Sequence, residues 1–258
     1  MPTTSALDVR ASLQTYWNAD AATYDLAASH VARTAAEQAA WRAVLARHLP
    51  PPPARILDVG AGTGFLSIPL ARLGYDVTAL DLSHGMLECL RSRARSEGLE
   101  IAIMEGGAEE PPVGPFDVVV ERLLLWTLTD PGETLASWRR VAPGGRLLCF
   151  EGAWGKADRL EAARSRARDW LRRLRRLPPE HHDHYPASVS ARIPFASGMN
   201  LSAVAEAIER AGWQNVRMER LRDVEWAKGM SLSLLDRLLG VTPEFMMVAD
   251  GYPAPKPT

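Results

Sequence analysis

Residues 55–64, Arg-Ile-Leu-Asp-Val-Gly-Ala-Gly-Thr-Gly, constrain the fold of this chain more than any other stretch. A short apolar run ends on Asp58 and is followed by three glycines at alternate positions, which predicts a β-strand that turns tightly into a helix. Glycines lack a Cβ, so they accept positive φ and let a ligand approach the backbone closely. The helix expected from about Phe65 would direct its free N–H groups and its positive dipole end at the same place.

The spacing of these glycines separates two kinds of nucleotide site. The dinucleotide fingerprint G-x-G-x-x-G needs its third glycine at position 65, where the chain has Phe65, one residue after Gly64. Asp58 at the strand exit would repel a pyrophosphate and would suit a ligand that carries an ammonium or another cation. The turn therefore favours a cationic adenosine compound over NAD or FAD.

Composition bounds the size and setting of the protein. A chain of 258 residues with 47% hydrophobic content can bury one substantial core. Lys and Arg number 30 against 31 Asp and Glu, so no overall basic excess points to nucleic acid as a partner. Cys89 and Cys149 are too few for a disulfide scaffold, and no window of about 18 uninterrupted apolar residues predicts a membrane span. We expect a soluble, cytoplasmic protein of one domain with additions.

From residue 55 onward, strand and helix signals alternate, which specifies parallel strands joined by right-handed crossovers. Asp81 ends the second expected strand, about twenty residues after the glycine turn, where an acid can accept hydrogen bonds from both hydroxyls of an adenosine ribose. Capping the next helix is its alternative role, although Ser83 can do this. The later loop 106–110 lies where a contact to an adenine amino group would be placed. The expected elements are strands at 56–59, 75–80, 100–104, 116–120 and 146–151, and helices at 65–73, 84–97 and 131–141.

The segment before this core is helical in pattern. Residues 6–49 are rich in alanine with apolar residues at helical spacing, and the prolines at 50–53 separate them from the first strand. Its aromatic residues Tyr16, Trp17 and Tyr24 either pack the segment onto the main domain or form a lid over a cofactor.

The segment after the core begins with an arginine-rich amphipathic helix at 158–177. A solvated face explains such a charge run, and anion binding is the alternative. Residues 181–185 hold half of the six histidines, but consecutive histidines point in different directions and make a poor metal site. A substrate-pocket acid, base or hydrogen-bond donor and an exposed loop stay open as interpretations. Alternation then resumes with a helix at 200–211, a strand at 216–221, a short helix at 231–239 and a last strand at 244–249.

In this order the features resemble the class I S-adenosylmethionine-dependent methyltransferases, particularly small-molecule enzymes of the ubiquinone and menaquinone biosynthesis type. The resemblance is carried by the glycine turn 57–64, the acidic strand end 80–83 and the segment 135–147, Leu-Ala-Ser-Trp-Arg-Arg-Val-Ala-Pro-Gly-Gly-Arg-Leu. It implies a Rossmann-like, doubly wound α/β sheet of seven strands in the order 3-2-1-4-5-7-6, with the last strand antiparallel. The implied parts are an N-terminal helical lid at 1–53, a cofactor-binding core at 54–151, a cap insertion after strand five at 152–199, the rest of the core at 200–250 and a disordered tail at 251–258.

The resemblance also implies the cofactor, S-adenosyl-L-methionine, with S-adenosyl-L-homocysteine as product. The residues expected to contact it come from the lid, the glycine turn and the exits of strands two to four: Tyr16, Tyr24, Asp58, Gly60, Ala61, Gly62, Gly64, Asp81, Leu82, Met86, Gly107, Ala108, Glu109, Glu121 and Arg122. Related enzymes often place a histidine shortly after strand four, where this chain continues Leu-Leu-Leu-Trp at 123–126. A catalytic base is therefore expected from the cap or the lid. Its candidates are His181, His182, His184 and Tyr185, with Trp126 and Trp154 as pocket walls.

The implied function is transfer of a methyl group to an O, N, S or C nucleophile of a small molecule by in-line displacement. An RNA or protein methyltransferase that uses the arginine-rich helix, and a non-catalytic nucleotide-binding protein, are the alternatives. No metal and no membrane partner are expected. The acceptor does not follow from the fold, and the oligomeric state is open, with a homodimer as one option.

Overall fold

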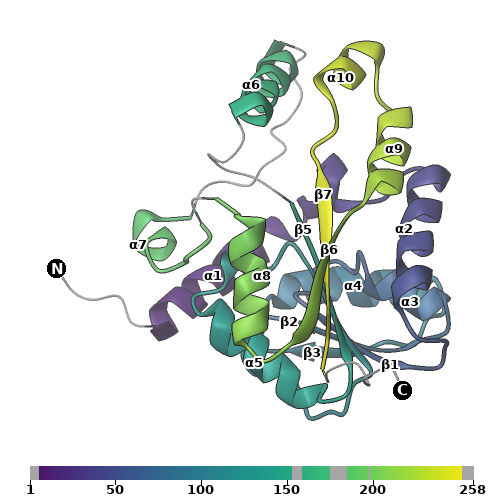
Figure 1. Cartoon of the computed structure of the whole chain (residues 1–258), viewed down its shortest axis with the longest axis vertical. Coiled ribbons are helices and arrows are strands. Elements are labelled where there is room, and N and C mark those ends of the chain that lie inside the picture. Colours follow the sequence, from purple (N-terminus) through teal and green to yellow (C-terminus); the bar gives the residue numbers. More distant parts are fainter. Residues whose placement is uncertain (1–5, 153–158, 175–184, 197, 252–258) are drawn as a thin grey trace.

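The computed structural model describes residues 6–152, 159–174, 185–196 and 198–251. A twisted sheet of seven strands crosses its middle, and helices cover both faces (Figure 1). The strand order is β3-β2-β1-β4-β5-β7-β6. Strand β7 runs antiparallel to β5 and β6, and the other neighbours pair in parallel. The sheet order and the antiparallel last strand predicted from the sequence are confirmed.

The elements follow one another as the sequence pattern indicates in outline. The strands are β1 (Arg55–Val59), β2 (Asp76–Asp81), β3 (Ala102–Glu105), β4 (Val118–Arg122), β5 (Arg146–Gly152), β6 (Gln214–Arg220) and β7 (Glu244–Asp250). The helices are α1 (Ala6–Asp20), α2 (Ala35–His48), α3 (Ser67–Arg72), α4 (His84–Ser96), α5 (Pro131–Val141), α6 (Arg159–Leu174), α7 (Ala187–Ser190), α8 (Leu201–Arg210), α9 (Arg222–Met230) and α10 (Leu234–Leu239). Short 3-10 helices are η1 (Tyr24–Leu26), η2 (Ala28–His30) and η3 (Leu125–Thr127).

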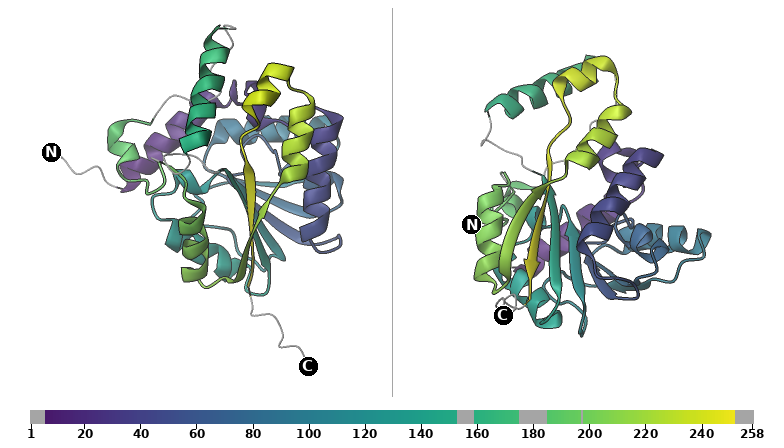
Figure 2. Two further views of the ribbon diagram at one scale, coloured as in Figure 1. Left: turned by 45° about the horizontal axis from the view of Figure 1, so that its top comes forward. Right: turned by 45° about the vertical axis from the view of Figure 1, so that its right-hand side comes forward.

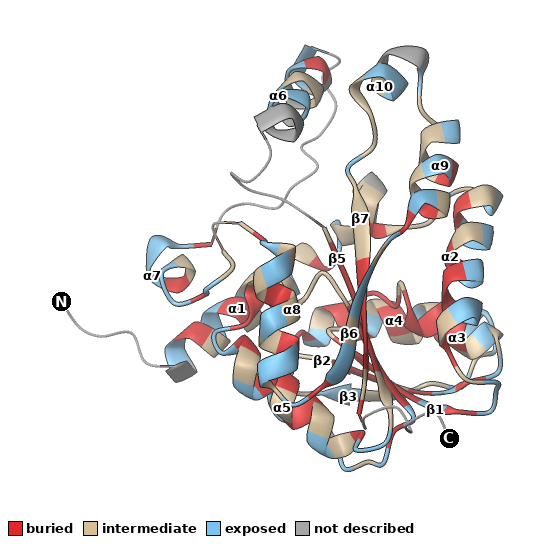
Figure 3. Ribbon diagram, in the orientation of Figure 1, coloured by how far each residue is buried: buried red, intermediate tan, exposed pale blue. Residues whose placement is uncertain are grey.

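The core has one apolar layer on each face of the sheet, because successive side chains of a strand point to opposite faces. In β1, Ile56 joins the layer under α2 that contains Trp41, whereas Leu57 joins the opposite layer with Trp138 and Trp213. The central strands are buried on both faces, and the helices that cover the sheet combine buried and exposed residues (Figure 3). This two-sided burial is what a parallel sheet requires.

Two helix caps bring helix N-termini to the carboxyl edge of the sheet. The Ser83 hydroxyl accepts a hydrogen bond from Met86 N at 3.1 Å and begins α4. The Asp130 carboxylate accepts from Glu133 N at 3.0 Å and begins α5, with Pro131 in its first turn. The positive dipole ends of α4 and α5 therefore lie at this edge.

Some predicted boundaries are wrong by a few residues. Helix α3 begins at Ser67 rather than Phe65, because residues 62–66 continue the turn. Strand β4 begins two residues later than predicted, because Phe116 N bonds to Val141 O at 2.9 Å, outside the sheet. Strand β3 begins two residues late, because Leu99 N closes the end of α4 onto Ala94 O at 2.9 Å.

The predicted arginine-rich helix is present as α6 over its described part. It lies beside α10 beyond one end of the sheet (Figures 1 and 2). Arg168 of α6 donates hydrogen bonds to Leu239 O and Gly240 O, both at 3.2 Å, at the C-terminal end of α10. None of the helices described combines the length and the apolar character that a membrane crossing needs. The predicted disordered tail lies, from residue 252 onward, outside the described residues.

Candidate active site

A cavity of about 380 Å³ lies at the carboxyl edge of β1, β2, β3 and β4, under α1. Its volume is within the range of about 300 to 1,000 Å³ typical of small-molecule sites. The predicted cofactor residues that line it are Tyr24, Gly60, Gly62, Asp81, Leu82, Met86, Gly107, Ala108, Glu109 and Arg122. A smaller cavity of about 20 Å³ adjoins it, and Asp58 and Ala61 lie there. Tyr16, Gly64 and Glu121 line neither.

The glycines of the turn serve two different purposes. Gly62 has φ of 53°, and a Cβ there would find no heavy atom closer than 4.0 Å, so its backbone faces open space in both cavities. A Cβ on Gly64, where φ is 95°, would come within 2.4 Å of the Leu90 side chain. Gly64 therefore allows the turn to pack on α4, whereas Gly62 leaves room for a ligand.

Asp81 joins the exit of β2 to the glycine turn. One carboxylate oxygen accepts a hydrogen bond from Gly62 N and the other from Ser83 N, both at 2.8 Å. Burial raises the pKa of this carboxyl group, and the backbone hydrogen bonds oppose that rise. Each oxygen has further acceptor capacity, and Asp81 lines the larger cavity. A ligand with paired hydroxyl groups would fit beside it.

Asp58 lies beneath the turn and is 2% exposed. Its carboxylate accepts a hydrogen bond from the Ser67 hydroxyl at 2.5 Å. Burial raises its pKa to about 7. A cationic ligand group nearby would keep it ionised, because an opposite charge favours the charged form.

Arg122 brings a positive charge to both cavities. Its guanidinium lies 3.9 Å from the ring centroid of Phe65 and 5.5 Å from that of Trp41, and it donates to Ser29 O at 2.8 Å. These contacts tie the end of β4 to η2, to the glycine turn and to α2. The smaller cavity is thus lined by both the Asp58 carboxyl group and the Arg122 guanidinium.

The carboxyl group of Glu121 lies in the interior rather than at the cavity. Glu121 and Glu151 are 0% and 2% exposed. Glu121 accepts a hydrogen bond from Leu124 N and Glu151 from Leu125 N, both at 3.0 Å. The pair therefore holds the turn at Leu123, where φ is 56°, and this turn contributes Leu124 to the cavity wall.

The lid aromatics divide between the cavity and a cluster behind it. Trp17 and Tyr24 line the cavity. Tyr16, Trp17, Trp126 and Tyr185 form an aromatic cluster, in which Trp126 stacks on Tyr185 with centroids 5.5 Å apart and Tyr16 meets Tyr185 edge-on at 4.7 Å. Trp126 thus lies outside the lining of the cavity, and Trp154 falls outside the described residues.

The predicted catalytic groups are only partly described. Burial raises the pKa of Tyr185 far above its usual value, which favours the protonated form of its hydroxyl. His181, His182 and His184 lie outside the described residues. Within the part of the chain that the structure describes, no three His, Cys, Asp or Glu side chains are arranged to hold a metal ion.

The sequence interpretation missed a buried histidine beside the site. His30 is 7% exposed and stacks on Tyr24, with ring centroids 3.9 Å apart. Its Nδ1 lies 2.8 Å from Tyr24 O; a carbonyl only accepts, so Nδ1 carries the proton and Nε2 is the basic nitrogen. The close sequence spacing of Tyr24 and His30 was the available signal.

Other cavity residues were also missed. Arg10 and Leu13 line the cavity together with Trp17; their i, i+3, i+7 spacing marks one helical stripe. The start of α5 and the loop before it add a further wall, formed by Thr127, Leu128, Thr129, Asp130, Glu133 and Thr134.

Known proteins resemble this chain in sequence. Residues 57–149 match the family model of a methyltransferase domain. A ubiquinone biosynthesis O-methyltransferase of Caulobacter sp. (strain K31) is 41% identical over 98 residues, which are 36% of this chain and 39% of that protein. The enzyme of the same description from Xanthomonas euvesicatoria pv. vesicatoria (strain 85-10) is 31% identical over 63% of this chain and 69% of its own length. The chain thus spans from about two fifths to about two thirds of the length of these relatives.

Solved structures share the fold. A SAM-dependent methyltransferase from Methanosarcina mazei superposes with a TM-score of 0.54 at 20% identity, covering 80% of this chain and 96% of that one. The sequence match extends to 71% of the length of a further ubiquinone biosynthesis O-methyltransferase, from Xanthomonas axonopodis pv. citri (strain 306), at 31% identity. With the sheet order and the glycine turn, these matches establish that the chain belongs to the class I S-adenosylmethionine-dependent methyltransferases, in the group that contains the ubiquinone biosynthesis O-methyltransferases.

Proposed function

We propose that this protein binds S-adenosyl-L-methionine in the larger cavity and transfers its methyl group to an oxygen of a small molecule. The observation that carries the proposal is Asp81, which faces the cavity while it accepts a hydrogen bond from Gly62 of the glycine turn. A carboxylate there suits the two hydroxyls of a ribose. Oxygen as the acceptor atom is supported by the names of the relatives.

The charges around the cavities fit the other end of this cofactor. Its methionine part carries one ammonium and one carboxylate group, and Asp58 and Arg122 supply the opposite charges in the smaller cavity. Leu82, Met86 and Ala108 offer apolar surface for the adenine ring. When bound, the cofactor supplies a methyl group on a positively charged sulfur, which is already activated for attack.

The protein then has to hold the acceptor oxygen in line and exclude water. Trp17 and Tyr24 cover the cavity from the lid side. Burial raises the pKa of Tyr24 to about 12, so its hydroxyl is a neutral hydrogen-bond donor. Alignment of this kind can contribute about 7 to 11 kcal/mol to lowering the barrier.

A general base is needed only when the acceptor oxygen still carries its proton, and it adds a factor of about 10² to 10⁴. His181, His182 and His184 stay candidates from the cap, and His30 joins them because its basic nitrogen belongs to a ring stacked on Tyr24. Replacing the three cap histidines by alanine in one variant and His30 in another would separate these sources through the pH profile of turnover.

The proposal is tested with purified protein, labelled S-adenosyl-L-methionine and a metabolite extract enriched in phenols, with the methylated compound identified by mass. Calorimetry with the same cofactor, its product S-adenosyl-L-homocysteine and NAD provides the binding control. Methyl transfer to a small molecule supports the proposal. Transfer to RNA or protein would support the alternative acceptor, binding without transfer a non-catalytic role, and NAD binding alone would overturn the cofactor. Cytoplasmic location and a homodimer stay predictions.

A further inference from the structure

We propose that Gln14 and Asn18 of α1 are positioning residues for the cofactor. They act through the backbone between the end of β2 and the first turn of α4, which we call the 81–86 shelf. The inference rests on the proposed function, because the shelf is where the adenosine part of the cofactor would lie. Both residues lie outside the 57–149 region that matches the family model.

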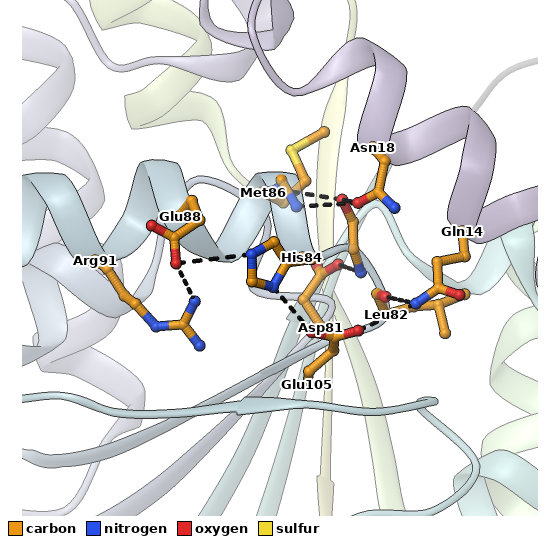
Figure 4. Close-up of polar contacts among 11 residues, drawn as sticks. Gln14, Asn18, Asp81, Leu82, His84, Met86, Glu88, Arg91 and Glu105 are labelled. Carbon is orange, nitrogen blue, oxygen red and sulfur yellow. Dashed lines mark hydrogen bonds and ion pairs between the residues drawn. The ribbon is translucent and has the colours of Figure 1, made fainter.

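Asn18 completes the N-terminal cap of α4 from a different helix. Its Oδ1 accepts hydrogen bonds from the Ser83 hydroxyl at 2.8 Å and from Gly85 N at 3.0 Å, while Ser83 itself accepts from Met86 N. Two successive N–H groups at the start of α4 are thus satisfied, one by each side chain. Figure 4 shows Asn18 reaching down from α1 to this turn.

Gly85 permits this close approach of α1 and α4. A Cβ at that position would lie 3.0 Å from the Ala21 Cβ and 3.2 Å from Asn18 O. Both contacts are tighter than side chains normally tolerate, so a larger residue would push α1 away. The position of α1 on the shelf is therefore specified by packing as well as by hydrogen bonds.

Gln14 holds the next part of the shelf. Its Nε2 donates to Leu82 O at 3.0 Å and to Glu105 Oε1 at 3.2 Å, which connects α1 to the ends of both β2 and β3 (Figure 4). Leu82 lines the cavity and directly follows Asp81. Without Gln14, the Leu82 carbonyl would exchange a fixed partner for water.

The same helix forms a wall of the cavity. Leu13 and Trp17, each one position before a shelf-binding residue, line the cavity. Gln14 and Asn18 are four residues apart and lie on one helical face. They therefore set the distance between the wall and the 81–86 shelf, and hence the width available to a flat ring between them.

The two amides play opposite chemical roles, which makes a sharp test. Asn18 contacts donors and uses its oxygen, whereas Gln14 contacts acceptors and uses its nitrogen. Asn18→Asp keeps the acceptor and adds a negative charge at the start of a helix, which is favourable. Gln14→Glu removes the donor and places a second carboxylate beside Glu105.

The experiment measures the Kd for S-adenosyl-L-methionine and S-adenosyl-L-homocysteine by calorimetry, and the Tm of each variant without ligand. Gln14→Glu should weaken binding about tenfold, because the Leu82 carbonyl loses its side-chain donor and a second carboxylate faces Glu105. Asn18→Leu should weaken it similarly, because the Ser83 hydroxyl and Gly85 N lose their acceptor. Asn18→Asp should bind within about twofold of the wild type. Thr15→Ala is the matched control, because Thr15 is exposed and, among the described residues, its hydroxyl bonds only to Ala11 O of its own helix.

If Gln14→Glu does not fold, Gln14→Ala replaces it, with weakened binding at an unchanged Tm as the expected result. Wild-type protein that binds neither ligand would make the proposed function wrong. Wild-type protein that binds both, with Gln14→Glu and Asn18→Leu equal to Thr15→Ala, would overturn the positioning role and leave the proposed function standing. A loss of affinity in Asn18→Asp as large as that in Asn18→Leu would also contradict the positioning role.

Discussion

Glu121 and Glu151 place two buried carboxyl groups on neighbouring strands, and each accepts a backbone N–H from the same turn. Burial, together with the neighbouring carboxylate, raises the pKa of Glu121 well above its usual value, and burial raises that of Glu151 to about 8. Ionising both groups would place two like charges close together in the interior, which costs free energy. The pair therefore retains a proton at neutral pH.

We expect this pair to make the protein less stable as pH rises. A carboxyl group whose pKa is higher in the folded than in the unfolded protein contributes stability that is present below the unfolded value of 4.5 and lost up to the folded value of about 8. Glu121→Gln removes one titrating group and keeps an acceptor for Leu124 N. Between about pH 5 and 8, the free energy of unfolding of Glu121→Gln, measured in urea, should therefore decrease by about 1 to 3 kcal/mol less than that of the wild type does.

The control for that change is Glu206→Gln, because Glu206 is exposed on α8. It should leave the slope of stability against pH unchanged. Glu121→Leu, which removes the acceptor, should destabilise the fold by about 1 to 3 kcal/mol at about pH 5, where the wild-type pair keeps its protons. Parallel pH profiles for the wild type and Glu121→Gln would contradict a shared proton.

Cofactor affinity should depend on pH through Asp58. Its pKa of about 7 means that it is mostly protonated at pH 6 and mostly ionised at pH 8. An ammonium group binds better to the ionised form, so the affinity for S-adenosyl-L-methionine should rise about tenfold over this range. Asp58→Asn should flatten the dependence. Calorimetry at both pH values measures it, and an affinity that falls with pH would refute this electrostatic role.

Two glycines of the turn should respond differently to alanine. Gly64→Ala places a Cβ within 2.4 Å of Leu90 at a positive φ, so we expect a loss of about 2 to 4 kcal/mol of stability. Gly62→Ala meets no heavy atom closer than 4.0 Å, although φ is positive there as well. It should therefore lower the stability less than Gly64→Ala does, and it should weaken cofactor binding. Thermal unfolding and ligand titration of both variants test this contrast. Equal losses of stability in the two variants would contradict it.

The arginines on the outside of α6 should not affect turnover of a small neutral acceptor. Arg164, Arg166 and Arg173 are exposed, whereas Arg168 is bonded to the end of α10. Replacing the three exposed arginines by alanine should leave kcat/KM within about twofold of the wild-type value at both about 50 and about 200 mM salt. A small neutral acceptor offers no phosphate groups for these side chains to contact. A steep salt dependence that disappears in this variant would point to a polyanionic acceptor instead.

The glycine turn and Asp81 could be predicted because their signals are local. Strand, turn and acid follow one another in the sequence, and each needs only the parallel-sheet rule to be placed at the same edge. The sheet order came from the family resemblance of these same segments. Short polar elements were harder to predict from the sequence. Helix α9 was not predicted, because only Val224 and Ala227 of its residues are buried, which is too short an apolar pattern to mark a helix.

The role of Glu121 could not be predicted from its position. It follows a buried strand, as a cavity residue would, but its direction depends on where β4 begins and on Glu151 in the neighbouring strand. The contribution of α1 was hidden for a similar reason. Gln14 and Leu82 are 68 residues apart, and nothing local in either segment indicates that they meet.

The missing side chain at Gly85 has a consequence for the comparison of related proteins. Gly85 lies within the 57–149 methyltransferase region. Its lack of a side chain nevertheless lets α1, which lies outside that region, pack closely on α4. In a relative, alanine at this position would require the N-terminal helix to shift by a few tenths of an ångström, and a larger side chain would require a larger displacement. One position in the shared domain can thus sort relatives by how closely their N-terminal helix approaches α4.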